Sequence, residues 1–269
     1  MLSQHLLGDK LCLQLLPRMA YSARDPVRWH SLGITLERQR GVHAIDSDRR
    51  ADFDTFAGVL AQTPVGVEVF SESARGGEYL VLRLEAALAQ QLLPVTAQRV
   101  QAGGQRQALQ QAMGLRRLLL ACETDRLALE EAAMAFLAQA RAPEAQPKVQ
   151  PKAVVRVLDQ IGDEHHLPLS LDQLANTYGH NALRFLRDFT QAIGLTPHAY
   201  LVQVRLQAAR HLIEHTDQDL ASLALEAGFA HQSHMGSAFR KHLGMTPGQY
   251  RLRAGLMAGK PAPAGPPRL

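Results

Sequence analysis

The chain has few cysteines and lacks long apolar runs, and each shortage excludes a class of protein. Only two cysteines, Cys12 and Cys122, occur among its 269 residues, and neither lies in a CxxC pair or a Cys/His cluster. A disulfide-stapled secreted fold is therefore excluded, and we expect buried thiols in a reducing compartment. No stretch approaches the ~18 consecutive apolar residues that a membrane-spanning helix requires, so no membrane segment is expected.

Sequence signatures of catalysis and of metal binding are also missing. The chain contains no GxGxxG, P-loop or GxSxG pattern and no evident acid/base pair. No cysteine or carboxylate completes a metal site beside the histidines at 165–166 or at 231 and 234. We therefore expect no enzymatic activity, no cofactor and no metal. The N-terminus lacks a basic start and a cleavage site, so we expect mature protein there and not a signal peptide.

A short pattern occurs twice in the second half of the chain. Residues 189–200 read FTQAIGLTPHAY, and residues 239–250 read FRKHLGMTPGQY. The residues that recur 50 positions apart are Phe189/Phe239, Gly194/Gly244, Thr196/Thr246, Pro197/Pro247 and Tyr200/Tyr250. Those that recur 49 positions apart are Leu174/Leu223, Ala175/Ala224 and Gly179/Gly228. Two copies of a small helical unit with a turn glycine predict tandem helix-turn-helix modules, which are typical of proteins that read DNA.

The charge balance is compatible with that interpretation without establishing it. The formal net charge is +4, and 46% of the residues are hydrophobic. A globular chain with so small a positive excess must depend on individually placed side chains if it reads DNA.

Proline-rich segments divide the chain into parts. Residues 141–152 predict an extended linker, and residues 257–269 predict a disordered tail. The predicted domains are therefore 1–140 and 153–256.

Short alternating segments predict strands in the first domain. The strand-like segments are 29–37, 53–61, 65–70 and 78–84, separated by glycine, proline, serine or charged clusters. Several short strands at this spacing favour a small β-barrel or sandwich.

Residues 105–140 change to a helical period and predict two amphipathic helices. The first places Leu109, Ala112, Leu115 and Leu119 on one face. Such a face either covers the barrel or pairs two protomers. We predict a dimer through it, because it is more apolar than an exposed helix should be, and burial against the barrel is the alternative.

Capping signals locate the helices after the linker. A Ser-x-x-Gln capping box at Ser170 predicts a helix directly after it. Thr196 followed by proline predicts a long helix over residues 197–215. Gly179 and Gly228 are the predicted turns, because glycine adopts positive φ without strain.

These residues resemble a known family. Residues 153–253, with GLTPHAYLVQVRLQAARHLI and LASLALEAGFAHQSHMGSAFRKHLGMTPGQYR within them, are similar to the DNA-binding domain of the AraC/XylS family of bacterial transcription regulators. The β-rich front half resembles the cupin-like sensing and dimerisation domain of that family. The fold class implied is α+β: an N-terminal cupin-like β-barrel with two helices, then an all-α tandem helix-turn-helix domain.

The resemblance implies which side chains face the major groove, which admits one α-helix. The first reading helix would present Asn181, Leu183, Arg184, Leu186 and Arg187. The second would present Gln232, Ser233, Gly236 and Ser237, with Arg240 and Lys241 on phosphates. Arg187 occupies a position that the family uses on bases, whereas Ser237 stands where the family usually has arginine. Base readout is therefore expected mainly from the first module.

Trp29 and His43 are candidates for an effector pocket in the front domain. The alternative is a packed tryptophan and a surface histidine.

Together these features predict a cytoplasmic, nucleoid-associated bacterial transcription regulator. The resemblance implies an activator that binds promoter double-stranded DNA and RNA polymerase, forms a homodimer and senses a small-molecule effector. One alternative is a ligand-independent regulator whose front domain binds a protein. Another is a DNA-repair methyl acceptor, which would need a reactive cysteine, whereas Cys12 and Cys122 lie in leucine-rich stretches.

Overall fold

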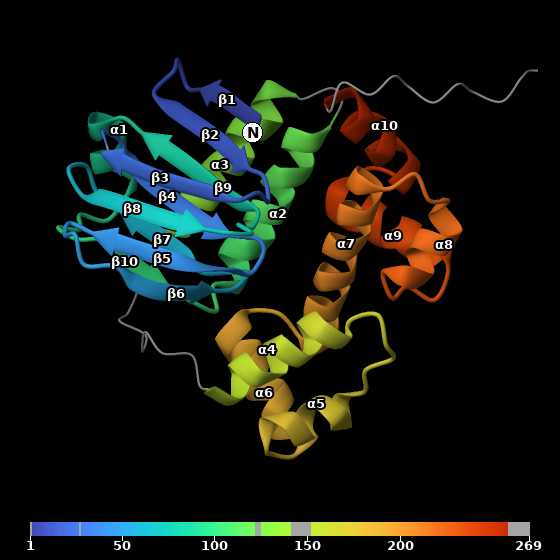
Figure 1. Ribbon diagram of the computed structural model, residues 1–269. Coiled ribbons are helices and arrows are strands. Elements are labelled where there is room, and N and C mark those ends of the chain that lie inside the picture. Colours follow the sequence, from blue (N-terminus) through green and yellow to red (C-terminus); the bar gives the residue numbers. More distant parts are fainter. Residues whose placement is uncertain (1, 27, 122–124, 141–151, 258–269) are drawn as a thin grey trace, which may run out of the picture. The chain divides into compact units, whose positions relative to one another are not determined.

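The computed structural model describes residues 2–26, 28–121, 125–140 and 152–257 (Figure 1). Strands fill most of the first part of the chain, and helices make up the rest, so the α+β class is confirmed. The chain divides into two compact units, residues 1–150 with 188–195 and residues 151–187 with 196–269. The predicted linker and tail lie outside the described residues except for Lys152 and Met257, and the predicted domain boundaries stay a prediction.

The strands of the first unit are short and follow one another closely. They are β1 (Leu2–Leu6), β2 (Leu11–Leu16), β3 (Tyr21–Pro26), β4 (His30–Thr35), β5 (Gln39–Ile45), β6 (Ala51–Thr55), β7 (Leu60–Thr63), β8 (Glu68–Ser73), β9 (Tyr79–Leu84) and β10 (Val100–Ala102). Its helices are α1 (Ala86–Leu92), α2 (Arg106–Leu120) and α3 (Arg126–Leu137).

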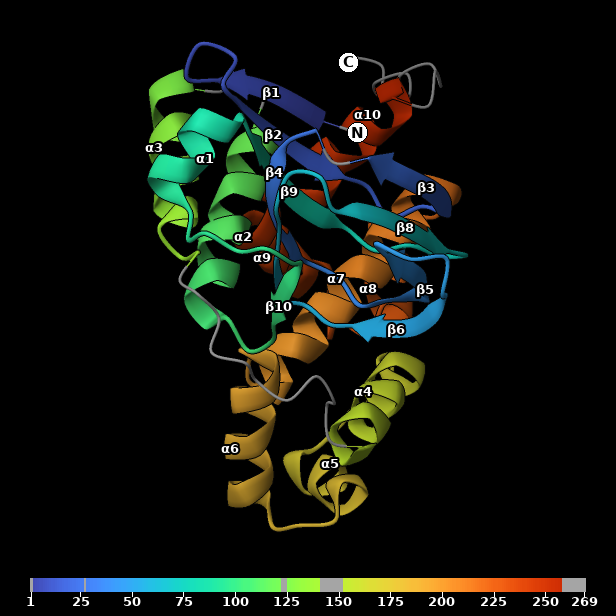
Figure 2. The same ribbon diagram turned by 90° about the vertical axis from the view of Figure 1, so that its left-hand side faces the viewer.

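The strands form two antiparallel sheets. The six-stranded sheet has the order β1-β2-β9-β4-β7-β10, and the four-stranded sheet has the order β3-β8-β5-β6. The expected barrel is therefore a pair of sheets that the strand pairing of the described residues does not close. Figure 2 shows the helices α1–α3, the six-stranded sheet and the four-stranded sheet as successive layers.

Strand β9 shows how the sequence builds these layers. Successive side chains of a strand point to opposite faces of the sheet. Leu80, Leu82 and Leu84 are fully buried on the face that the helices cover, whereas Tyr79 and Arg83 point to the space between the sheets. One strand thus supplies the apolar core and the wall of a cavity.

The helical face predicted to pair two protomers is buried within a single chain. The side chains of Leu109, Ala112, Leu115 and Leu119 are each at most 5% exposed. The prediction of a dimer through this face is therefore wrong, and the alternative is confirmed: these side chains complete the core beneath the six-stranded sheet. The periodicity showed an apolar face but not what covers it.

A buried ion pair ties helix α2 to the segment before β9. Arg116 Nη1 lies 2.7 Å from Glu78 Oε2, and both side chains are at most 2% exposed. The amide of Glu78 donates to Glu37 Oε2 at 3.3 Å. Losing either partner would leave a buried charge without compensation, which is strongly destabilising.

The segment predicted as one strand over residues 53–61 is two strands in different sheets. β6 ends at Thr55 and β7 begins at Leu60, and Gly58 turns the chain between them with φ of 85°. The chain crosses from one sheet to the other here, and alternation of side chains alone does not reveal such a corner.

The second unit consists of helices. They are α4 (Lys152–Glu164), α5 (Leu171–Tyr178), α6 (Ala182–Ile193), α7 (Pro197–His215), α8 (Leu220–Glu226), α9 (Gln232–Leu243) and α10 (Pro247–Met257). The C-terminal half of α6, from Asp188 onward, belongs to the first compact unit. The phenylalanines of this part of the chain are buried; they are Phe185, Phe189, Phe229 and Phe239. Among the described residues, no helix combines the length and apolar character needed to cross a membrane.

Candidate DNA interface and ligand cavity

The ends of helix α5, in the first helix-turn-helix module, are fixed by the capping residues that the sequence predicts. Ser170 Oγ accepts from the Gln173 amide at 3.2 Å, and Gln173 Oε1 accepts from the Ser170 amide at 2.7 Å. Helix α5 ends at Gly179, whose φ of 86° is left-handed. These interactions satisfy backbone groups that the helix ends leave free, so α5 and α6 meet at a defined turn.

Helix α6 exposes an arginine-bearing face. Leu183 is 79% exposed, and Arg184 and Arg187 are also exposed, whereas Leu186 is half-buried. Asn181, which was also predicted to face the major groove, precedes the helix, and its side-chain oxygen accepts from the Arg184 amide at 2.9 Å. Asn181 therefore caps the helix, and three of the predicted residues, Leu183, Arg184 and Arg187, form the exposed face.

The second module repeats the plan with different caps. Asp219 Oδ1 accepts from the amides of Ala221 and Ser222 at 2.9 and 3.0 Å and starts α8. The hydrogen bonds from the Ser222 side chain and backbone lower the pKa of Asp219 below its usual value. At the start of α9, His231 Nδ1 accepts from the His234 amide at 3.1 Å. A ring nitrogen thus replaces the oxygen that usually caps a helix.

Helix α9 exposes small polar side chains where α6 exposes arginines. Gln232, Ser233 and Ser237 are exposed, and Ser237 Oγ donates to the Ser233 carbonyl at 3.0 Å. Arg240 and Lys241 are exposed one turn further along. Gly236, in contrast, is buried, and the guanidinium of Arg240 lies 3.7 Å from the place where a β-carbon would stand. Gly236 offers no surface of its own in this arrangement.

Helix α7 connects the modules and is held against the loop after α4. The 19 residues of α7 span about 28 Å at 1.5 Å per residue. Arg205 Nε donates to the His165 carbonyl at 2.8 Å, and Arg205 Nη2 donates to the Leu167 carbonyl at 2.9 Å. The same loop lies against the second turn, because a β-carbon on Gly228 would stand 2.4 Å from the His165 carbonyl oxygen.

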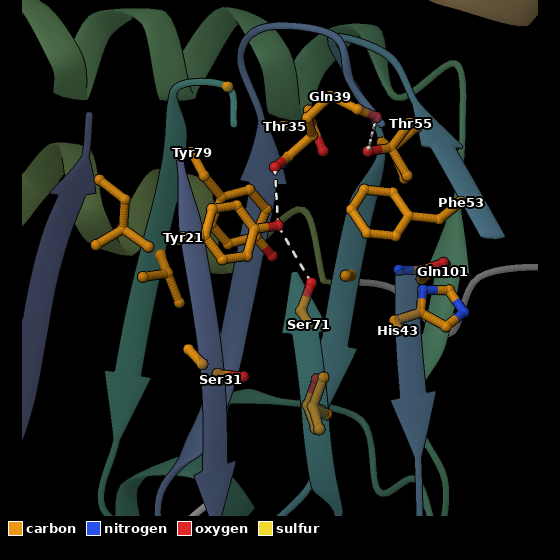
Figure 3. Close-up of a pocket in the computed structure, with 18 of the residues that line it drawn as sticks. Tyr21, Ser31, Thr35, Gln39, His43, Phe53, Thr55, Ser71, Tyr79 and Gln101 are labelled. Carbon is orange, nitrogen blue, oxygen red and sulfur yellow. Dashed lines mark hydrogen bonds between the residues drawn. The ribbon is translucent and has the colours of Figure 1, made fainter. Parts of the chain in front are cut away.

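A cavity of about 400 Å³ lies between the two sheets of the first unit. Both sheets line it: Figure 3 shows Tyr21 and Phe53 from the four-stranded sheet and Tyr79 from the six-stranded sheet in this space. The hydroxyl of Tyr21 lies 3.2 Å from Gln39 Oε1, to which it donates, and 3.1 Å from Ser71 Oγ. A concave space of this size with a mostly apolar wall is typical of small-molecule sites.

The two predicted pocket residues have different positions. His43 lines the cavity and stacks on Phe53, with ring centroids 5.4 Å apart and planes within 6°. His43 is half-buried, and its role as a pocket residue stays a prediction. Trp29 is half-buried and does not line the cavity. Sequence reasoning missed the other lining residues, among them Arg83 and Arg99; the alternation in β9 could have indicated Arg83, but Arg99 follows no such pattern.

Comparisons with known proteins found similar proteins for the helical part of the chain. A family model described as a helix-turn-helix domain matches residues 174–253. The chain is similar to an uncharacterized HTH-type transcriptional regulator of Haemophilus influenzae, with 32% identity over 104 residues that cover 39% of this chain and 34% of that protein. It is similar to the HTH-type transcriptional activator RhaS of Escherichia fergusonii, with 34% identity over 83 residues that cover 31% and 30%.

One solved structure is similar over the same share of the chain. It is a transcriptional regulator with an AraC-type DNA-binding domain from Chromobacterium violaceum, with 27% identity and a TM-score of 0.37. The match covers 38% of this chain and 92% of that one. The chain spans about a third of the length of the curated relatives it matches.

Proposed function

Since this chain belongs, through residues 174–253, to the AraC-type helix-turn-helix family, we propose that it is a transcription regulator that reads promoter DNA with both modules. The observation that carries the proposal is a pair of capped helix-turn-helix modules joined by α7, each with an exposed polar face on its second helix. Successive major grooves on one face of B-DNA lie about 34 Å apart, a spacing that a connecting helix of this length suits.

The two modules contribute unequally to the recognition of bases. Arg184 and Arg187 on α6 carry guanidinium groups that pair with guanine O6 and N7 in two parallel hydrogen bonds. Gln232 on α9 suits adenine, whereas Ser233 and Ser237 form weaker contacts with any base. Arg240 and Lys241 bind phosphates, which position the protein without specifying sequence.

The regulator activates transcription and responds to a small molecule in the first unit. The likeness to a relative named as an activator supports activation. The cavity between the sheets favours a sensor over the ligand-independent alternative, because a front domain that only binds a protein needs no cavity of this size. RNA polymerase and a second copy of the chain stay predicted partners, and the surface predicted for dimerisation is already used within one chain.

Selection from a pool of random duplexes tests DNA reading by the full-length chain. We expect a bipartite consensus with guanines in one half, and binding that weakens steeply as salt rises, because phosphate contacts release counterions. A chain carrying both Arg184→Ala and Arg187→Ala should lose the guanine-rich half and keep the salt dependence. Recovery of no consensus at any salt concentration would overturn the proposal.

A further inference from the structure

We propose that the cavity between the sheets binds a small organic acid with an apolar body, and that Arg99 holds its carboxylate. This inference rests on the proposed sensor role of the first unit and specifies the class of effector. It depends on three observations: a row of hydroxyls and arginines across one wall, an arginine without an acidic partner, and a cluster of apolar side chains in the remaining wall.

The polar row follows from the strand register. In the six-stranded sheet, Arg83 on β9 lies opposite Ser31 on β4, and Ser31 lies opposite Thr63 on β7. Arg99 directly precedes β10, whose first residue pairs with Gln62 beside Thr63. All four side chains of this row (Arg83, Ser31, Thr63 and Arg99) line the cavity. Two cationic groups and two hydroxyls therefore lie at one level of the wall.

Arg99 has only uncharged partners in this row. Its Nη1 donates to Thr63 Oγ1 at 2.6 Å, and no carboxylate of the described residues forms an ion pair with it. The described lining of the cavity contains no aspartate or glutamate at all. Arg99 is half-buried, and partial burial of a guanidinium without a counter-charge has a cost, so a bound anion would stabilise this arrangement.

Neighbouring titratable groups do not supply the missing negative charge. Burial and then the Arg99 cation lower the pKa of His43 below its usual value, which keeps the imidazole neutral at pH 7. Burial raises the pKa of Tyr79 above its usual value, an effect that the Arg99 cation opposes, so the phenol stays protonated. The charge that faces the cavity is therefore positive.

The remaining wall suits a flat or branched apolar body. Val59, Val69, Val81 and Ile45 line it, and Phe53 adds an aromatic face. Tyr79 occupies the recess left by Gly33, where a β-carbon would stand 2.1 Å from the tyrosine hydroxyl. The hydroxyl of Tyr21, on the same wall, already pairs with Gln39 and Ser71, whereas an acid places its only strongly polar group on Arg99. The guanidinium matches a carboxylate with two parallel hydrogen bonds.

Matched pairs of probes test the proposal on the full-length chain without DNA. Naphthalene-2-acetate and octanoate, with their neutral amides, are titrated by calorimetry, and phenyl phosphate and glucose are titrated beside them. We expect at least one of the two acids to bind, at least tenfold more tightly than its amide. Glucose should not compete with it. A phosphate that binds more tightly than both acids, or an amide that equals its acid, would overturn the proposal.

Two variants separate recognition of the charge from a general effect on the fold. Arg99→Gln should reduce affinity for the acid at least tenfold and leave affinity for the amide unchanged, while Arg75→Gln, at an exposed arginine outside the cavity, should change neither. Unchanged acid binding in Arg99→Gln, or no binding of either acid to the parent chain, contradicts the inference. Because DNA is absent from these titrations, such a failure leaves the proposed reading of DNA intact.

Discussion

The two helix-turn-helix modules share a scaffold and differ in what they expose. Both start from a capped helix and turn at a glycine with φ near 85°, and both bury a phenylalanine pair. The exposed face of α6 carries Leu183 and two arginines, whereas that of α9 carries glutamine and serines. After duplication of such a unit, caps and core must be kept for folding, but the outer face of the second helix is free to diverge.

The turn glycines show a less visible difference between the modules. Gly179 has φ of 86° and faces open space within 4 Å, whereas Gly228 has φ of 85° and is pressed against the His165 carbonyl. The two glycines therefore have the same backbone conformation but differ in the space available for a side chain. In the first module glycine is needed only for its conformation, and in the second it is also needed for its lack of a side chain.

Gly228→Ala should cause the largest change. We expect it to lower the free energy of unfolding by about 2–5 kcal/mol, since left-handed alanine costs about 1–2 kcal/mol and overpacking adds about 1–3 kcal/mol. Gly179→Ala should show only the first cost. Urea unfolding followed by circular dichroism at 222 nm measures both, and fluorescence of the single tryptophan, Trp29, should keep its midpoint because it reports on the first unit. Equal losses in the two variants would mean that the close approach at Gly228 relaxes freely.

Arg187→Ala and Ser237→Ala compare the two reading faces. Loss of Arg187 should weaken binding to the selected site by about 1–3 kcal/mol and relax preference at one or two base pairs. Loss of Ser237 should cost no more than about 0.5 kcal/mol, as is usual for an exposed side chain. Fluorescence anisotropy at fixed salt measures both affinities. Equal losses would show that the second module reads bases as strongly as the first.

The caps differ in their response to acid, and this effect is the smallest. The pKa of Asp219 is lowered in the folded chain, so its stabilisation is present above the unfolded pKa and is lost as pH falls through the folded value. The difference in urea midpoint between the parent and Asp219→Asn should therefore shrink as the pH is lowered from 7 toward 3. The corresponding difference for Ser170→Ala should stay constant, because a hydroxyl cap does not titrate in this range. A difference that is independent of pH at Asp219 would contradict the argument.

The helical unit could be predicted closely because its signals are local. The helix expected over residues 197–215 is α7 to the residue, and the capping box at Ser170 is present. Each of these features depends on residues a few positions apart. The cap of α8, Asp219, is likewise a local feature, because it accepts from amides two and three residues further along.

The first unit was harder to predict, because the pairing of its strands depends on residues that are far apart in the sequence. Residues 2–16 form the hairpin β1–β2, which turns through Leu7, Gly8 and Asp9 at positive φ, and Leu11, Leu13 and Leu15 do alternate, so this strand was detectable. Strand β3 (YSARDP) shows no apolar alternation, yet it contributes Tyr21 to the cavity. A cavity lined by both sheets has no pattern in sequence, which explains why only His43 of the two predicted residues lines it.

The alternation along β9 separates two kinds of evolutionary change. Tyr79, Val81 and Arg83 line the cavity, while the leucines between them are fully buried on the opposite face of the strand. A substitution at an odd-numbered position can alter the chemistry of the cavity without repacking the core, and one at an even-numbered position does the reverse. Under the proposed sensor role, descendants of this chain can therefore respond to a new ligand through a few changes on one side of a strand, while the side chains on its other side maintain the stability of the domain.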